Sequence, residues 1–317
     1  MADLAALLAA VRSNPDDIAM RLVYADALSD AGDPRGELIV LQCRSPGSER
    51  ERELLAEHRD AWLGKLAPIL DPEHTRFANG FLTDARVQRV ARPKLSKVVG
   101  DPMWSTVAQL DFDSTVGGIV MKTGPVVRGP KVPAAAIVLS PIMRALRSVR
   151  GIDGDVLVTL CRDGNALPIR SIDAIMYPLL ERDAIDVWRV ADEPRTAIEL
   201  GAGLPALRRL TLRGYPCDQP DLRWLLGSPL AGRLAQLELD NFGGDLEQWA
   251  AMSRDAHPGL GELVVHWWGA WRFRRGTDGA LSVLDVDTRR LTDFQRERLD
   301  AALARVRPMF QHVEIRR

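Results

Sequence analysis

The sequence predicts a mixed α/β repeat protein, in which a small helical module (residues 1–75) precedes an irregular repeat array (residues 76–317). One apolar pattern occurs three times, as Leu207-x-x-Leu210-x-Leu212, Leu234-x-x-Leu237-x-Leu239 and Leu260-x-x-Leu263-x-Val265. The copies begin 27 and 26 residues apart. These intervals lie within the roughly 20 to 29 residues that a leucine-rich repeat uses for one strand and its return segment. A second observation is a series of helix-start signals before residue 50. We therefore expect a helical module followed by a short leucine-rich-repeat-like solenoid.

The composition is that of an ordinary globular protein. Of 317 residues, 46% are hydrophobic and 27% are charged, which argues against disorder and low complexity. Forty-two basic residues oppose 43 acidic residues, so the formal net charge is −1. No global field attracts nucleic acid or an anionic membrane, and only a local basic patch could do so.

Cysteine usage and the N-terminal stretch give no sign of a metal site or of export. Cys43, Cys161 and Cys217 are far apart and form no CxxC motif, so we expect free thiols and no bound metal. Asp3 stands where a signal peptide carries positive charge, and Arg12 interrupts the apolar run. No apolar run reaches the ~18 residues that span a bilayer. We expect a cytoplasmic protein without a membrane partner.

The N-terminal module is predicted from three helix starts. Leu4, Leu7, Leu8 and Val11 recur at helical spacing and define a first helix. The segment 14–17, Asn-Pro-Asp-Asp, predicts a second start with its asparagine as the cap, and Asp33-Pro34 predicts a third. Three starts within 35 residues indicate a small antiparallel helical unit.

The residues of this module resemble a known family. The run Arg21-Leu-Val-Tyr-Ala-Asp-Ala-Leu-Ser-Asp-Ala-Gly-Asp-Pro-Arg-Gly-Glu-Leu-Ile-Val-Leu-Gln42, with Asn14-Pro-Asp-Asp17 before it and Ala61-Trp-Leu63 after it, resembles the bacterial repeat-companion domain. The match covers about residues 4 to 65 and departs at Ala27, where the family favours tryptophan. The resemblance implies a module that accompanies leucine-rich-repeat-like arrays, and it implies no catalytic residues.

Earlier segments resemble degenerate repeats. Residues 81–90 predict a strand that leaves the helical unit, which places a boundary near residue 75. Val107-x-x-Leu110-x-Phe112 is a first degenerate repeat, Leu146-x-x-Val149-x-x-Ile152 is a slipped copy, and Ile169-x-x-Ile172 is another. Their unequal spacing predicts an irregular array. The segment from Gly117 to Pro133 is expected to be an irregular loop.

The return segments and the end of the array have their own signals. Residues 221–226 and 245–252 predict short capped helices between the strands. Residues 271–275 and 281–286 flank a loop rich in glycine and predict a hairpin. A helix over residues 292–305 and a capping strand over 310–315 complete the prediction.

Alternation along the repeat strands predicts one exposed polar row. Side chains between and beside the last two apolar positions point away from the core together. A solvated surface explains such a row, and a protein-binding surface of the kind that solenoids use explains it equally well. Earlier strands contribute Gln109, Asp111, Asp113, Ser171 and Asp173 to this row, and Val264 shares it. The candidate partner-binding residues of the three clear repeats are Arg209, Thr211, Arg213, Gln236, Glu238, Asp240, Glu262 and His266.

The segment from His266 to Arg275 is rich in tryptophan and arginine. Trp267, Trp268, Trp271 and Arg272 are further candidate partner-binding residues, because these residue types are concentrated in protein interfaces. The same composition stacks on unpaired bases, and aromatic rings near the end of an array also seal its core. Core, protein interface and nucleic-acid contact all remain open for this segment.

No catalytic motif is present. The sequence contains no G-x-S-x-G, H-E-x-x-H, P-loop or G-x-G-x-x-G pattern, and its five histidines are scattered. We predict a non-catalytic protein-binding or scaffolding module without a cofactor. The alternative is a nucleic-acid-binding protein that uses residues 266–275 and the region from Lys94 to Lys97.

Overall fold

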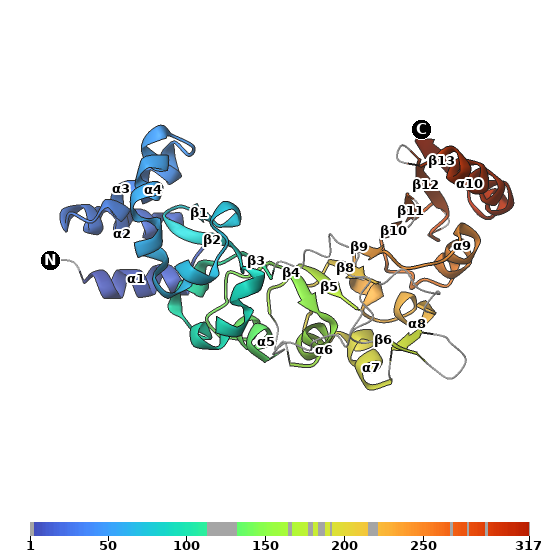
Figure 1. Ribbon diagram of the computed structural model, residues 1–317, viewed down its shortest axis with the longest axis horizontal. Coiled ribbons are helices and arrows are strands. Elements are labelled where there is room, and N and C mark those ends of the chain that lie inside the picture. The colour runs from blue at the N-terminus through green and yellow to red at the C-terminus, as the bar shows by residue number, and fades with distance from the viewer. Residues whose placement is uncertain are drawn as a thin grey trace. The chain divides into compact units, whose positions relative to one another are not determined.

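A computed structural model of the chain gives a mixed α/β fold with two compact units, Met1–Arg150 and Gly151–Arg317 (Figure 1). The structure describes residues 3–112, 132–163, 167–176, 180–182, 188–190, 192–214, 221–266, 269–277, 279–288 and 291–316. None of the helices in these ranges combines the length and the apolar character needed to cross a bilayer. The predicted loop from Gly117 falls outside the described residues up to 131, and its last two positions open a helix.

The first unit contains four consecutive helices, a hairpin and two further strands. The boundary between the units falls within the last of these strands, so the predicted helical module shares its unit with strands. The elements are α1 (Leu4–Ser13), α2 (Ile18–Asp30), α3 (Pro34–Arg44), α4 (Glu49–Leu63), η1 (Gly64–Ile69), η2 (Pro72–His74), β1 (Arg76–Ala78), β2 (Phe81–Arg86), η3 (Arg89–Val98), η4 (Pro102–Thr106), β3 (Gln109–Asp111), α5 (Val132–Val138) and β4 (Ser148–Asp153).

The second unit alternates strands with short helices. The elements are α6 (Gly154–Asp163), β5 (Ser171–Ile175), β6 (Leu180–Arg182), β7 (Trp188–Val190), α7 (Asp192–Leu200), β8 (Arg209–Arg213), α8 (Arg223–Leu226), η6 (Ala231–Arg233), β9 (Gln236–Asp240), α9 (Leu246–Arg254), β10 (Glu262–His266), β11 (Ala270–Arg274), β12 (Val283–Asp287), α10 (Asp293–Val306), η7 (Arg307–Met309) and β13 (His312–Arg316).

Eleven strands form one open sheet in the order β1-β2-β3-β4-β5-β8-β9-β10-β11-β12-β13, and β6 pairs with β7 alone. In the second unit, β5, β8, β9 and β10 pair in parallel, one after the next. Helices α6, α7, α8 and α9 follow one another along one side of these strands, and consecutive helices are in contact (Figure 1). Strand β11 then runs antiparallel to both β10 and β12.

The three copies of the apolar pattern are in register, as predicted. Leu210 lies opposite Leu237, and Leu237 lies opposite Leu263. All three side chains are fully buried. Since a strand places alternate residues on the same face, the preceding and following apolar positions of each copy are buried beside them. The pattern is therefore the shared core of neighbouring strands.

The earlier, irregular copies keep the same register. Leu110 lies opposite Val149, although the two copies begin 39 residues apart. In β4 the third apolar position is Gly151, which explains why this copy looks slipped. A further copy that sequence analysis missed is Leu82-x-x-Ala85-x-Val87, because its central residue is alanine; Ala85 lies opposite Leu110. Variation in spacing is thus confined to the return segments.

A backbone hydrogen-bond pattern marks the start of several repeats. The carbonyl oxygen of the second residue in one copy accepts two N–H groups from the next copy. Ala108 O accepts from Arg147 and Ser148, and Arg208 O accepts from Ala235 and Gln236, at 2.7–3.1 Å. These bonds satisfy backbone groups that burial would otherwise leave without partners.

The hairpin, the helix and the strand predicted for the last part of the chain are confirmed. Strands β11 and β12 form the antiparallel pair, and α10 begins after Thr292, whose side chain caps the helix in a capping box with Gln295. Strand β13 then pairs in parallel with β12. Leu281-x-x-Leu284-x-Val286 is another buried copy of the apolar pattern, and β13 carries the last copy beside it. The second short helix, α9, has the same kind of capping box at Asp245.

The helical module forms as predicted, with one correction. Asp33 caps α3 by accepting the Arg35 N–H at 2.9 Å. Asn14 was expected to cap the second helix, but it ends α1. The cap of α2 is Asp17, which accepts the Met20 N–H at 3.0 Å. The expectation at Asn14 was wrong because two later aspartates compete with it, and a carboxylate at this position accepts the free N–H groups of the first turn.

Buried polar side chains from α2 and α3 hold the turn between β1 and β2. The Arg21 guanidinium donates to the carbonyl oxygens of Ala78 and Asn79 at 3.1 and 3.2 Å. Arg35 Nε donates to Gly80 O at 3.0 Å, and the Gly80 N–H donates to Gln42 Oε1 at 2.6 Å. The turn needs this support because Asn79 and Gly80 both have positive φ, 51° and 78°.

The ring of Phe81 contacts both arginines. Their guanidinium carbons are 4.9 and 4.6 Å from its ring centroid, which is the geometry of a cation–π contact. Burial lowers the pKa of both arginines from its usual value. The carbonyl oxygens and the ring compensate the buried charge. Arg21, Arg35 and Gln42 all belong to the run that resembles the repeat-companion domain, so that run includes the residues that join the helices to the first strands.

We expect Arg35→Met to destabilise the first unit by about 1.5–3 kcal/mol, because a charged donor to a buried carbonyl is lost while the length of the side chain is kept. Arg44→Met, at an exposed position of the same helix, is the control. Urea unfolding followed by circular dichroism measures both variants. Equal stability of the two variants would show that the buried arginine contributes nothing.

We expect Leu237→Ala to cost about 2–5 kcal/mol, because it leaves a cavity between two in-register leucines. Thr211→Ala, on the opposite face of the neighbouring strand, should change stability by less than about 0.5 kcal/mol. The measurement is the midpoint of urea unfolding. A small effect of Leu237→Ala would contradict a shared leucine core.

Candidate functional site

The candidate site is the face of the second unit's sheet that points away from the buried leucines, called here the polar face. The register aligns one outward residue from each strand into a row. One such row runs through Asp173, Thr211, Glu238, Val264, Arg272 and Asp285. The polar face consists of Ser171, Asp173, Arg209, Thr211, Arg213, Gln236, Glu238, Asp240, Glu262, Val264, His266, Arg272, Arg274 and Asp285.

Ion pairs between neighbouring strands stabilise this face. Arg213 Nη2 lies 2.6 Å from Asp173 Oδ2, across the pairing of β8 with β5. His266 Nε2 lies 3.0 Å from Glu238 Oε1, across the pairing of β10 with β9. Both contacts are diagonal, from the last outward residue of one strand to the middle outward residue of the strand before it. The repeat geometry therefore places the same kind of contact twice.

A second group of contacts continues the network toward β12. Glu262 accepts a hydrogen bond from Gln236 Nε2 at 3.1 Å, and Arg272 Nη1 lies 3.9 Å from its other oxygen. Arg274 Nη2 lies 2.6 Å from Asp285 Oδ2. Much of the polar face is thus paired internally, which fixes the side chains.

Three outward positions are buried, and two of them, Asp173 and Val264, belong to the row that was expected to be exposed. Asp173 is 7% exposed, Asp285 is 3% exposed and Val264 is 1% exposed. Strands in a sheet are about 4.8 Å apart, so a long side chain on one strand covers a short one on the next. Arg213 lies over Asp173 in this way, and Arg274 lies over Asp285. A partner therefore meets the arginines before it meets these aspartates.

The open part of the face lies on β8 and β9. Arg209 is exposed, and it forms no ion pair within the described part of the chain. Thr211 and Asp240 are half-exposed. These three side chains come from neighbouring strands and offer both charges and a hydroxyl group within a short distance.

The segment rich in tryptophan and arginine is divided between the two faces. Trp271 and Phe273 point into the core, so the expectation that Trp271 belongs to a partner-binding surface with Arg272 was wrong. Alternation along β11 decides this, because adjacent residues of a strand point to opposite faces. Phe273 packs against Phe310, with ring centroids 5.8 Å apart. Trp267 and Trp268 lie outside the described residues.

The environment of Glu238 favours its charged form. The hydrogen bond from His266 lowers the pKa of Glu238, and the charges of His266, Arg272 and Arg209 act in the same direction. Partial burial opposes this by raising the pKa, but it is the smaller effect. The carboxylate is therefore ionised at neutral pH, as a pairing and recognition group needs to be.

The described residues give little support for a metal site or for a reactive cysteine. Within them, no three histidine, cysteine, aspartate or glutamate side chains gather closely enough to hold a metal ion. Burial raises the pKa of the Cys161 thiol to about 12, so it is not a nucleophile at neutral pH. Cys43 is half-buried and its Sγ lies 3.5 Å from Asn79 Oδ1. Cys217 lies outside the described residues.

Comparison with known proteins adds no assignment: no family model matches the chain, and no similar curated protein or solved structure was found.

We expect Glu238→Gln to lower stability at pH 7 by about 0.2–1 kcal/mol. Because the pKa of Glu238 is lowered in the folded state, its contribution is present above its ordinary value of 4.5 and is lost as the pH falls through the lower folded value. The difference from the wild-type protein should therefore shrink in urea titrations below pH 4.5. Asp240→Asn, on the same face, serves as the control, and a pH-independent difference would exclude the His266 contact as the cause.

Proposed function

We propose that this protein is a non-catalytic binding or scaffolding module whose second unit presents the polar face to another protein. The observation that carries the proposal is the asymmetry of the repeat strands. Their inward positions are aliphatic, whereas nearly every outward position from β5 to β10 is polar or charged. Packing requires only the inward set. An ordered polar lattice on the other side is the kind of surface with which repeat proteins bind partners.

The first unit has a supporting role in this proposal. Its helical module resembles the repeat-companion domain, and its buried arginines hold the hairpin that begins the sheet. We propose that the strands continue as a short solenoid, with the helical module attached at its first strands. Copies of the apolar pattern that are in register from β2 to β4, from β5 to β10 and between β12 and β13 support this architecture.

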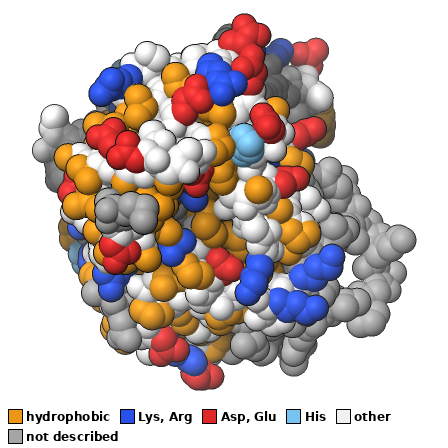
Figure 2. All heavy atoms as spheres, turned by 90° about the vertical axis from the view of Figure 1, so that its left-hand side faces the viewer, with side chains coloured by type: hydrophobic (Ala, Val, Ile, Leu, Met, Phe, Trp, Pro, Cys, Tyr) orange, Lys and Arg blue, Asp and Glu red, His pale blue; other side chains and the backbone are white. Residues whose placement is uncertain are grey.

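The charges of the polar face favour a protein over a nucleic acid. Its four arginines, Arg209, Arg213, Arg272 and Arg274, accompany five acidic residues, so the surface is nearly balanced. Phosphate backbones are bound by surfaces with a clear excess of positive charge. Figure 2 views the side on which the N-terminal helices lie, and there too acidic and basic side chains occur near one another among hydrophobic ones. A partner with complementary mixed charges fits this surface better.

The described aromatic side chains of residues 266–275 do not support nucleic-acid binding. Trp271 and Phe273 are buried, so they cannot stack on bases, and Arg274 is paired with Asp285. No observation in the described part of residues 266–275 favours that function over protein binding.

The proposal is tested at the open part of the face. Arg209→Glu should reduce affinity for the native partner by about tenfold or more, because reversal places like charges together. Neither this substitution nor Asp240→Lys breaks an ion pair between described residues. The partner is first captured from lysate of the source cells with the wild-type protein, identified by mass spectrometry and then titrated in purified form.

Arg254→Glu is the matched control, since Arg254 is exposed on α9 and is not part of the polar face. Thermal melts establish that all variants fold. If both Arg209→Glu and Asp240→Lys bind the native partner with unchanged affinity, the binding surface does not lie on β8 and β9.

A further inference from the structure

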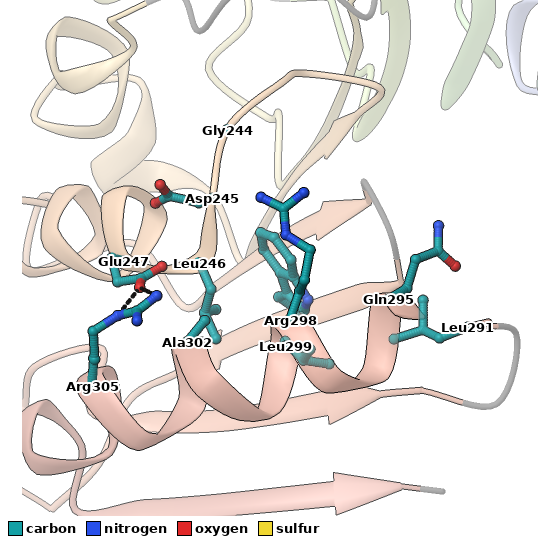
Figure 3. A pocket seen from close by; sticks show the side chains of 11 residues that line it. Gly244, Asp245, Leu246, Glu247, Leu291, Gln295, Arg298, Leu299, Ala302 and Arg305 are labelled. Carbon is teal, nitrogen blue, oxygen red and sulfur yellow. Dashed lines mark hydrogen bonds and ion pairs between the residues drawn. The ribbon is translucent and has the colours of Figure 1, made fainter. Parts of the chain in front are cut away.

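A pocket of about 310 Å³ lies on the opposite side of the sheet from the polar face, between the first turn of α9, strand β11 and helix α10 (Figure 3). This volume is at the lower end of the range for small-molecule sites. At about 30 Å³ per non-hydrogen atom, it holds roughly ten such atoms. The pocket lies wholly within the second unit.

The interior of the pocket is apolar. It is lined by Leu246 of α9, Trp271 of β11, and Leu291, Leu299 and Ala302 in and before α10, all of them buried. Such a lining gains free energy from the apolar body of a ligand, at about 25 cal/mol for each Å² removed from water. These apolar side chains offer no polar group that could bind a small inorganic ion.

The acceptor groups at the pocket already have partners. Glu247 forms an ion pair with Arg305, which Figure 3 marks by dashed lines. Asp245 accepts the Gln248 N–H at 2.9 Å as the cap of α9, and Figure 3 shows its carboxylate turned away from Arg298. Both carboxylates of the lining therefore already have partners within the protein.

Two donor groups of the lining, on Trp271 and Gln295, have no partner among the described residues. Trp271 is 3% exposed, and its Nε1–H has no hydrogen-bond partner among the described residues. Gln295 uses its Oε1 to accept from Thr292, which leaves the two N–H donors of its Nε2 without a described partner. Burial of a donor without an acceptor is unfavourable, so a ligand that brings an acceptor to Trp271 Nε1 would be stabilised in this pocket.

Arg298 adds positive charge to the same site. It lines the pocket from α10, and Figure 3 shows its guanidinium extending from the helix toward Gly244. The guanidinium has five N–H donors in a planar fork that matches a carboxylate. The nearby N-terminus of α9 contributes partial positive charge as well.

From an apolar interior, two donors without described partners and a guanidinium, we infer that this pocket binds a small organic monocarboxylate of about ten non-hydrogen atoms in all, most of them apolar. The apolar body occupies the space between Leu246, Leu299 and Ala302. The carboxylate accepts from Arg298 and from the donors of Gln295 and Trp271. This site is independent of the polar face, because Trp271 and Arg272 point to opposite sides of β11.

The test compares 3-phenylpropionate with its neutral amide, 3-phenylpropanamide, which has the same apolar body. Isothermal titration of the full chain should show the acid binding roughly tenfold or more tightly than the amide, as expected for loss of a charged hydrogen bond. In ¹H–¹⁵N spectra the Trp271 indole resonance, assigned with Trp271→Phe, should shift when the acid binds.

Arg298→Ala should weaken binding of the acid by about tenfold and leave the affinity for the amide unchanged. Arg296→Ala is the matched control, because Arg296 lies on the same helix but does not line the pocket. Both positions are exposed, so both variants are expected to fold. Arg209→Glu should bind the acid normally, which separates this test from that of the proposed function.

Three outcomes would overturn the inference. These are no binding of the acid, equal binding of the acid and the amide, and binding that neither shifts the Trp271 indole resonance nor responds to Arg298→Ala.

Discussion

In-register burial of aliphatic side chains between neighbouring strands is the constraint on which the second unit depends. Leu210, Leu237 and Leu263 lie opposite one another, and none of them could be buried by its own repeat. Once these residues are aligned, the outward residues are aligned too, because the side-chain period of a strand is two. The polar face and its ion pairs are therefore a geometric result of the core.

A different interaction anchors the first unit. Two buried arginines and a glutamine satisfy the backbone of a turn whose residues have positive φ. Apolar packing alone would leave those carbonyl oxygens without donors, at a cost comparable to several ordinary contacts. The helices thus contribute polar groups as well as apolar area to the first strands. The run that resembles the repeat-companion domain has here a structural role that can be traced to single hydrogen bonds.

Sequence analysis predicted most of the helices and strands, but it did not predict which side chains of the polar face are buried. The strands of the three regular copies, the hairpin, the last helix and the last strand are confirmed, because each depends on local periodicity or capping. The copies at Leu82 and Leu281 were missed, since alanine stands at the centre of the first and the second lies within the predicted hairpin. The burial of Asp173 and Asp285 was also unpredictable. It depends on which long side chain of the next strand lies across each carboxylate, and a sequence does not show that. The place of Asp113 in the row and the role of Trp267 and Trp268 as partner-binding residues stay predictions.

The unequal return segments have an evolutionary consequence. Copies that begin 26 or 39 residues apart still place their strands side by side, so chain can be added between strands without changing the spacing of the outward side chains. Insertions and deletions therefore alter the return segments and leave the arrangement of the polar face intact. A lineage of such proteins can acquire new loops without losing a surface that already works, and it can exchange single outward residues without disturbing the hydrophobic layer beneath them.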